Sequence, residues 1–258
     1  MSASNAPRRI VSLVPSLTEA LLHFGVGDRL VGRTRYCVEP QGRVSSIETV
    51  GGTKNPDIAR IVALEADLVV LNREENRSED WEALVAAGIP VWVSHPRSVA
   101  EAADMLAALG RAVDARQQGD DLASACRSAL QEARARSRAH RARSVFCPIW
   151  RNPWMTFRRS TYVGSMLEAA GLRNVFADAA DTDFFAVELD AALATQPEII
   201  LLPDEPYAFS TKHADELRAH GAKSVILQVD GRDLSWYGPR IPGALRRLWT
   251  ITADISRI

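Results

Sequence analysis

The stretch VAEAADMLAALGRAVDARQQGDDLASACRSALQEARARSRAHRAR, residues 99–143, decides the fold of this 258-residue chain. It contains no proline, it is rich in Ala, Leu, Arg, Glu and Gln, and its glycines are Gly110 and Gly119. These residue types favour helix, and apolar positions recur at helical spacing with charged residues between them. The stretch therefore predicts one or two long helices. Twenty-odd helical residues from Arg116 to Arg138 would reach roughly 30 Å, enough to join two lobes stiffly.

The segments on either side of this stretch follow the same order of elements. Each begins with an apolar strand, at 9–14 and 144–149, and continues through two helices, a strand, an acidic loop, a helix, a glycine and a further strand. Gly88 and Gly221 hold equivalent places in the two sets. Strands that alternate with helices are typical of parallel sheets, because parallel neighbours need a crossover connection.

We therefore expect an α/β fold of two similar lobes with mostly parallel sheets, joined by a long backbone helix. The expected domains are an N-terminal lobe at 1–98, a linking helical segment at 99–143 and a C-terminal lobe at 144–258. The expected strands lie at 9–14, 30–32, 67–71, 89–93, 144–149, 198–202 and 224–229. The expected helices outside the link lie at 17–24, 57–64, 80–87, 162–170, 187–194, 213–220 and 241–255.

Composition and charge exclude several classes of function. The chain is 47% hydrophobic and 24% charged with a net charge of −1, so no general argument for nucleic-acid or anionic-membrane binding arises. The arginine run at 134–143 is the one basic cluster and is typical of a solvated helix face. The three cysteines, Cys37, Cys126 and Cys147, are widely spaced, and this spacing predicts neither a disulfide framework nor a cysteine metal site.

The N-terminal residues indicate the cellular location of the protein. Residues 1–9 are short and polar, and the apolar stretch 10–14 is broken by Pro15, so no secretory signal pattern can be drawn there. No window approaches the run of about 20 apolar residues that a membrane-spanning helix requires. As written, the sequence predicts a cytoplasmic protein, or a periplasmic one if it is an engineered mature form.

Three loops of the N-terminal half carry candidate functional residues. Ser16 follows the first strand, where it would cap a helix with Glu19 completing a capping box; alternatively, the strand end and helix start would face a ligand. The Tyr36 ring could stack on a flat ligand or pack against the protein itself. Cys37 beside it is expected to be half-buried. The loop VGGTKNPD at 50–57 lacks the spacing of a phosphate-binding loop. Its paired glycines suit either close contact with a polar-edged ligand or a tight turn.

Two loops of the C-terminal half are rich in aromatic residues. WRNPWMT at 150–156 follows the first strand of that half, and at least one of its two tryptophans is expected to face a cleft. DGRDLSWYGPR at 230–240 follows the last strand and adds aromatic side chains and arginine. Neither G-x-S-x-G nor H-E-x-x-H occurs, and the five histidines are scattered. This combination indicates a binding site and no enzymatic activity.

Taken together, four segments carry a resemblance to a known family: RIVSLVPSLTE at 9–19, VGGTKNPD at 50–57, WRNPWM at 150–155 and SWYG at 235–238. The chain resembles the substrate-binding proteins of cobalamin, haem and ferric-siderophore ABC importers, and is most similar to the cobalamin branch. The resemblance implies a ligand sandwiched between two lobes that hinge little. It implies one wall made of Pro15, Ser16, Tyr36, Gly52 and Thr53, and another made of Trp150, Trp154, Trp236, Tyr237 and Arg240.

The same resemblance implies a partner. In this family a surface carboxylate on each lobe docks onto arginines of the membrane permease, and Glu74 or Glu75 and Glu205 resemble that pair. They lie in the equivalent acidic loops of the two halves. Solvated loop carboxylates with no such role remain the alternative.

These observations favour a monomeric binding protein for a corrinoid ligand, associated with ABC import, with no catalytic residues, no resident metal and no cofactor. A haem binder would need an axial His or Tyr, and a siderophore binder would need converging basic residues, for which Arg240, Arg151 and Lys54 are available. A cytoplasmic enzyme or metallochaperone acting on corrinoids or metals is the remaining alternative. It predicts a cluster of His, Asp or Cys with perturbed pKa values in the cleft.

Overall fold

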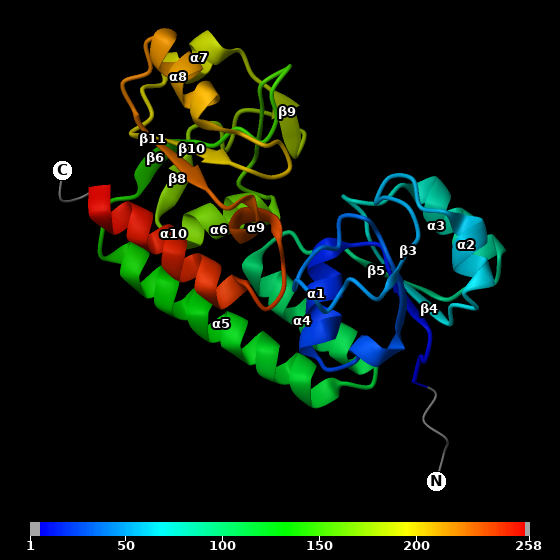
Figure 1. Cartoon of the computed structure of the whole chain (residues 1–258). Helices are drawn as coiled ribbons and strands as arrows, with labels where there is room; N and C mark the ends of the chain where they lie inside the picture. Colours follow the sequence, from blue (N-terminus) through cyan, green and yellow to red (C-terminus); the bar gives the residue numbers. More distant parts are fainter. Residues whose placement is uncertain (1–5, 256–258) are drawn as a thin grey trace. The chain divides into compact units, whose positions relative to one another are not determined.

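The computed structural model describes residues 6–255 and contains two compact units (Figure 1). The units take their described residues from the following segments: unit 1 from Met1–Pro96, Ala102–Ser124 and Tyr237–Pro239, and unit 2 from Arg97–Glu101, Ala125–Trp236 and Arg240–Ile258. The segment expected at 99–143 as a separate link is therefore divided between the units, and two of the boundaries fall inside its helices.

Two long helices lie in the middle of the chain. Helix α4 spans Val99–Ala112 and helix α5 spans Arg116–Arg138. Asp114, with a φ of 53°, lies in the short turn between them. The prediction of one or two long helices is confirmed, and the structure has two.

Unit 1 is built on a sheet in which every strand pair is parallel. The strand order is β3-β2-β1-β4-β5, with β1 at Ile10–Ser12, β2 at Leu30–Arg33, β3 at Glu48–Thr49, β4 at Leu68–Asn72 and β5 at Val91–Ser94. Helices α1, α2 and α3 span Pro15–His23, Ile58–Ala63 and Ser78–Ala86, and η1 spans Gly27–Arg29. The chain leaves the sheet on one side of β1 and returns on the other, which creates a topological switch point between β1 and β4.

Unit 2 repeats this plan. Its main sheet has the order β11-β10-β6-β8 and is again parallel throughout, with β6 at Arg143–Phe146, β8 at Leu172–Asn174, β10 at Ile199–Pro203 and β11 at Val225–Val229. Helices α6 to α10 span Tyr162–Ala169, Leu189–Ala194, Thr211–Ala219, Gly231–Ser235 and Ile241–Ile255. Strands β8, β6, β10 and β11 correspond in order to β2, β1, β4 and β5, so the switch point of unit 2 lies between β6 and β10. The prediction of two similar α/β lobes with mostly parallel sheets is confirmed.

The central strands are buried because helices pack on the sheet faces. Every residue of β4 and of β10 is buried. In unit 1 the core joins Val11 and Leu71 of the sheet to Ile61 of α2 and Leu84 of α3. Continuous apolar runs in the sequence therefore mark these two strands, as expected for strands covered on both faces.

The structure corrects several local expectations. Helix α1 begins at Pro15, and its N-cap is Val14 without a side-chain cap, so the expected capping box of Ser16 and Glu19 is wrong. Proline suits the first helical position because its missing N–H would have no helical partner there. Cys37 is fully buried rather than half-buried. The segment expected as a loop at 230–240 contains the short helix α9.

Several short strands were not predicted from the sequence pattern. The pair β7 (Met155–Phe157) and β9 (Phe184–Ala186) forms a separate two-stranded antiparallel sheet, and neither these strands nor β3 and β8 were expected. Each has two or three residues, too few for alternation to be recognised.

The two glycines of the central stretch bring α4 and α5 into backbone contact within unit 1. A Cβ on Gly110 would lie 2.7 Å from the Cα of Gly119, and a Cβ on Gly119 would lie 2.8 Å from the Cα of Gly110. Both distances are shorter than van der Waals contact. Glycine is therefore required at both positions by packing, although it weakens an isolated helix.

We expect Gly119→Ala to lower the free energy of unfolding by about 1–3 kcal/mol, because the added methyl group must push two backbones apart. Urea unfolding would measure the change. Gln118→Ala is the matched control, since Gln118 is exposed on the same helix and surface changes cost within about 0.5 kcal/mol. A Gly119→Ala protein as stable as the parent would contradict the proposed packing role, because alanine alone should favour the helix.

Candidate functional site

Open parallel sheets bind ligands beyond the carboxyl ends of their strands, next to the switch point. In unit 1 this edge carries the loops that follow β1, β2, β3 and β4. Pro15 and Ser16 open α1 directly after β1, Tyr36 follows β2, and Gly52 and Thr53 follow β3. All five residues that the resemblance assigned to one wall therefore lie at this edge of unit 1.

Two asparagines set the shape of these loops. The side-chain amide of Asn76 donates to the carbonyl oxygens of Leu13 at 3.2 Å and Thr53 at 2.9 Å, and its oxygen accepts from the Asn72 N–H at 2.8 Å. Asn72 in turn accepts from the backbone N–H of Glu74 at 2.8 Å. Three loops that are distant in the sequence are thus held together by buried amides. Neither asparagine could be selected from the sequence, because hydrogen bonds between loops leave no periodic signal.

Tyr36 presents an aromatic ring at the surface of unit 1. Its side chain is 56% exposed, and its hydroxyl has no hydrogen-bond partner among residues 6–255. The Tyr36 ring lies close to Gly52, since a Cβ on Gly52 would be 3.3 Å from Cε2 of Tyr36. A glycine at this point lets the ring approach the loop backbone.

Ser16 carries a buried hydroxyl without a hydrogen bond. Ser16 is 1% exposed, and its Oγ has no partner among the described residues. Nearby, Thr18 is fully satisfied: its hydroxyl lies 2.8 Å from Ser12 Oγ and 3.0 Å from Cys37 Sγ. Burial raises the pKa of the Cys37 thiol, so this cysteine remains protonated. A hydroxyl left unpaired costs about 1–3 kcal/mol, so Ser16 is a position at which a polar ligand group or a water would stabilise the structure.

Unit 2 carries an aromatic cluster at its own switch point. Trp150 follows β6 and Tyr207 follows β10, and their rings meet edge to face with 5.6 Å between centroids. Trp150 is 44% exposed. Trp154, in the same loop, is only 8% exposed and stacks on Phe209 at 5.7 Å with 11° between the ring planes. One of the two tryptophans is thus accessible at the surface and the other belongs to the core, while the orientation of either toward a cleft stays a prediction.

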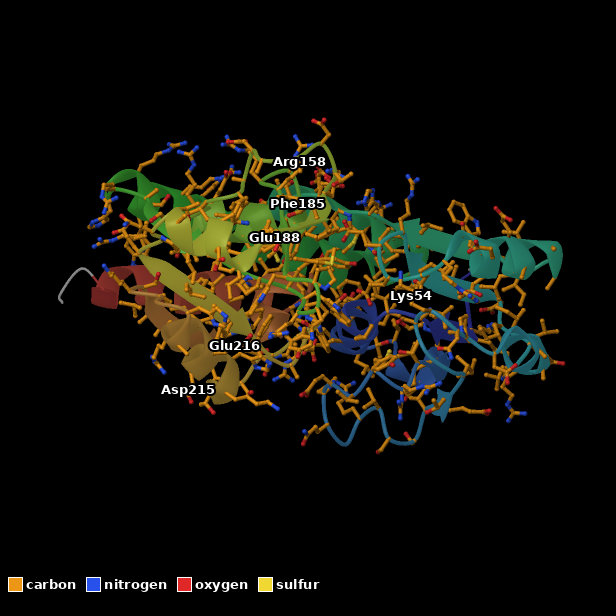
Figure 2. The ribbon with its side chains drawn as sticks, turned by 90° about the horizontal axis from the view of Figure 1, so that it is seen from above. Lys54, Arg158, Phe185, Glu188, Asp215 and Glu216 are labelled. Carbon is orange, nitrogen blue, oxygen red and sulfur yellow. The ribbon has the colours of Figure 1, made fainter. Side chains whose placement is uncertain are left out.

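Arg151 supports this loop instead of extending freely. Its guanidinium lies 5.2 Å from the centre of the Trp154 ring and forms a bidentate ion pair with Glu216. Glu216 lies on α8 beside Asp215 (Figure 2). The hydrogen bond from Arg151 lowers the pKa of the Glu216 carboxyl.

Trp236 and Arg240 lie together after α9. The Arg240 guanidinium lies 5.1 Å from the centre of the Trp236 ring, and the indole N–H of Trp236 donates to Glu205 at 3.1 Å. Gly231 makes this arrangement possible, because a Cβ there would lie 2.5 Å from backbone atoms of Glu205. Tyr237, expected to accompany Trp236, belongs to unit 1, where its hydroxyl lies 3.5 Å from a Glu75 carboxylate oxygen.

The three carboxylates considered for permease docking each have a partner within their own unit. Glu74 lies 3.5 Å from His95 Nε2, and its carbonyl oxygen accepts from the Lys54 ammonium at 2.7 Å. Glu75 contacts Tyr237, and Glu205 contacts Trp236. Their docking role stays a prediction.

Within the described part of the chain, no group of three or more His, Cys, Asp or Glu side chains is arranged to hold a metal ion. No helix there is both long and apolar enough to cross a membrane. Cys126 and Cys147 are buried, and burial raises the pKa of Cys126 to about 12.

The buried environment of Glu205 predicts a pH dependence of stability. Desolvation raises the pKa of this carboxyl in the folded state, so the folded protein binds its proton more tightly than the unfolded chain does. Its contribution to stability is therefore present at low pH and lost as the pH rises. We expect Glu205→Gln to gain stability relative to the parent as the pH rises from about 4 to 7.

Glu216→Gln is the matched control, with the opposite sign. The pKa of Glu216 is lowered in the folded state, so its ion pair stabilises at neutral pH and the glutamine variant should lose stability there. Urea unfolding of both variants across this pH range measures the two trends. If the stability of both variants changed in the same direction with pH, the opposite pKa shifts assigned to Glu205 and Glu216 would be contradicted.

Comparison with known proteins connects this geometry to a family. The sequence model of a family described as periplasmic binding protein matches residues 10–224. The vitamin B12-binding protein of Yersinia pestis (strain Pestoides F) is 25% identical over 255 residues, which is 98% of this chain and 89% of the relative.

Solved structures agree on the fold. The periplasmic vitamin B12 binding protein BtuF of Vibrio cholerae is similar with a TM-score of 0.82 and 23% identity, over 98% of this chain and 99% of that one. The periplasmic heme-binding protein RhuT from Roseiflexus sp. RS-1 is similar with a TM-score of 0.83 and 23% identity, over 96% and 99%. Because the family match extends over most of the sequence, the chain belongs to the periplasmic binding protein family.

Proposed function

We propose that this protein binds a corrinoid, cobalamin-like ligand and delivers it to an ABC importer. The observation that carries the proposal is the exposure of Tyr36 and Trp150, one in each unit, in loops at the carboxyl edges of the two parallel sheets. Large aromatic faces in such loops suit a broad, flat ligand. The vitamin B12-binding relative supports the same ligand class.

A polar group at the carboxyl edge of unit 1 suits the amide side chains at the edge of a corrin ring: the Ser16 hydroxyl lacks a partner among the described residues. The proposed ligand contacts are the residues named for the two walls, although Trp154 is stacked on Phe209 in the core. The ligand would be recognised by side chains of both units, and the protein itself would supply no catalytic group.

A haem ligand is the second candidate. The Tyr36 phenol is exposed, and tyrosine is one of the side chains that ligate haem iron. The similar structure of RhuT is that of a heme-binding protein. A ferric siderophore is less well supported, because Arg151 is paired with Glu216 and the Lys54 ammonium is bound to a carbonyl oxygen.

A cytoplasmic enzyme or metallochaperone acting on corrinoids or metals is the remaining alternative, and it predicts a cluster of His, Asp or Cys with perturbed pKa values in the cleft. We further propose that the protein works as a monomer outside the cytoplasmic membrane, where an importer receives its substrate. The carboxylates of Glu74, Glu75 and Glu205 are the proposed docking groups for the permease. Cell fractionation tests the location.

Calorimetric titration of the ligand-free protein tests the ligand class. We expect one-to-one binding of cyanocobalamin and no comparable binding of hemin or a ferric siderophore. Tight binding of hemin alone would replace the first candidate by the second. No binding of any of the three by a folded sample would contradict both.

We expect Trp150→Ala to weaken cyanocobalamin binding by about 1–3 kcal/mol, because an exposed aromatic face is lost. Trp81→Ala is the matched control: Trp81 is also partly exposed, at 36%, but lies on α3 and is not among the residues named for the two walls. Titration calorimetry of the two variants gives the comparison. Equal affinities for Trp150→Ala and the parent would remove Trp150 from the site.

A further inference from the structure

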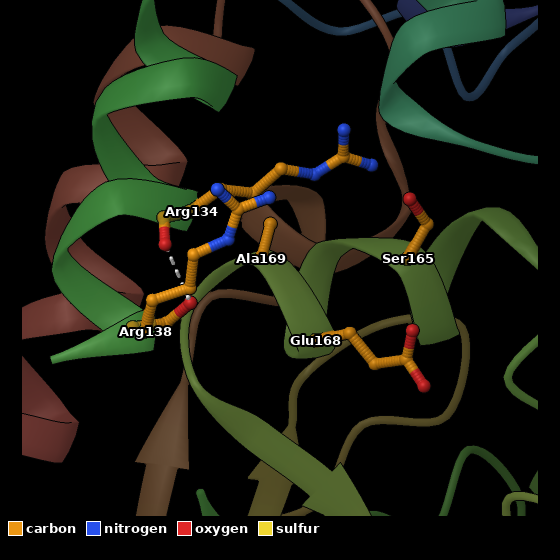
Figure 3. A pocket seen from close by; sticks show the side chains of 6 residues that line it. Arg134, Arg138, Ser165, Glu168 and Ala169 are labelled. Atoms are coloured by element: carbon orange, nitrogen blue, oxygen red, sulfur yellow. Dashed lines mark hydrogen bonds between the residues drawn. The ribbon is translucent and has the colours of Figure 1, made fainter. Parts of the chain in front are cut away.

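A small half-open cavity lies in unit 2 between α5 and α6, and it belongs to none of the strand-end loops described above. Its volume is about 240 Å³. The residues that line it are Arg134, Ser137 and Arg138 of α5, and Ser165, Glu168 and Ala169 of α6 (Figure 3). Sites for drug-sized organic ligands occupy about 300–1,000 Å³, so the cavity suits a smaller group than a tetrapyrrole.

Two arginines at this cavity, Arg134 and Arg138, have no carboxylate partner among residues 6–255. They lie one helical turn apart and are exposed. Other arginines of the same run are paired: Arg136 with Glu132, and Arg141 and Arg143 with Glu198. The positive charge of the run is therefore uncompensated at the cavity in particular.

The remaining lining groups favour an anion in this place. Figure 3 shows the side chains of Arg134 and Arg138 extending from α5 toward α6, while the Glu168 carboxylate points away from both guanidinium groups. Glu168 lies 3.8 Å from Arg159, which offsets its charge. Ser165 Oγ accepts from the Val99 N–H at 3.1 Å, which leaves its own proton available for an acceptor. Ala169 leaves room beneath the Arg138 guanidinium.

We propose that this cavity is a binding site for a phosphate-type oxyanion. Guanidinium groups recognise phosphate oxygens in a planar, two-pronged geometry, and two of them lining one cavity match a group with several oxygens and more than one charge. Free phosphate and a phospholipid headgroup share this chemistry. The site is separate from the proposed corrinoid contacts, so its test does not depend on them.

The test uses two probes and the full chain. Inorganic phosphate is titrated calorimetrically at constant ionic strength, and co-sedimentation with phosphatidylglycerol-containing vesicles is compared with phosphatidylcholine vesicles. The Arg134→Ala/Arg138→Ala double variant is expected to lose about tenfold or more in affinity, since both charge-assisted hydrogen-bond donors are removed. Arg136→Ala is the matched control from the same helix, because Arg136 is already paired with Glu132.

Phosphate binding that depends on Arg134 and Arg138 but not on Arg136 supports the proposal, with the free ion as a ligand. Binding only to the anionic vesicles, with the same dependence, supports it with a lipid headgroup as the source. No binding of either probe, or an equal loss with Arg136→Ala, overturns it. Alanine favours helix at these exposed positions, and circular dichroism of each variant shows that it is folded.

Discussion

Parallel pairing of the strands in both main sheets is the constraint on which the rest of the structure depends. Parallel neighbours cannot be joined by a tight turn, so connections such as those through α3 and α8 cross a sheet face, and strands such as β4 and β10 are buried on both sides. The loops at the carboxyl edges are then free to carry polar and aromatic side chains. Residues 73–76 in unit 1 and 204–209 in unit 2 are loops of this kind, and each follows a fully buried strand.

Much of this architecture could be predicted because it depends on local pattern. The apolar runs of β4 and β10, the helical period of α4 and α5, and the glycines after α3 and α8 are all readable within a few residues. The short strands β7 and β9 could not be predicted in this way, since they are stabilised by pairing with each other across a long loop. Helix α9 was missed for a similar reason: it has five residues, and its N-cap is the Asp230 side chain.

The candidate site, too, could be predicted only in part. Residue type and position predicted that aromatic side chains gather at strand ends, but not which of them are accessible. Trp150 and Trp154 lie in one loop of similar composition, yet stacking on Phe209 buries the second and leaves the first exposed. Likewise, the burial of the Ser16 hydroxyl depends on packing around α1. Such outcomes are decided by tertiary neighbours, which a single sequence does not encode in any short pattern.

The contact between α4 and α5 has a consequence for how this chain can diverge. Each Cβ that a substitution would add at Gly110 or Gly119 meets backbone atoms of the opposite helix, and a backbone cannot be trimmed by a second mutation. A change at one position therefore has no compensating change at the other. Relatives that retain this close contact between α4 and α5 should keep glycine at both positions, while the surrounding surface residues vary. In a lineage that loses either glycine, the two helices must lie further apart.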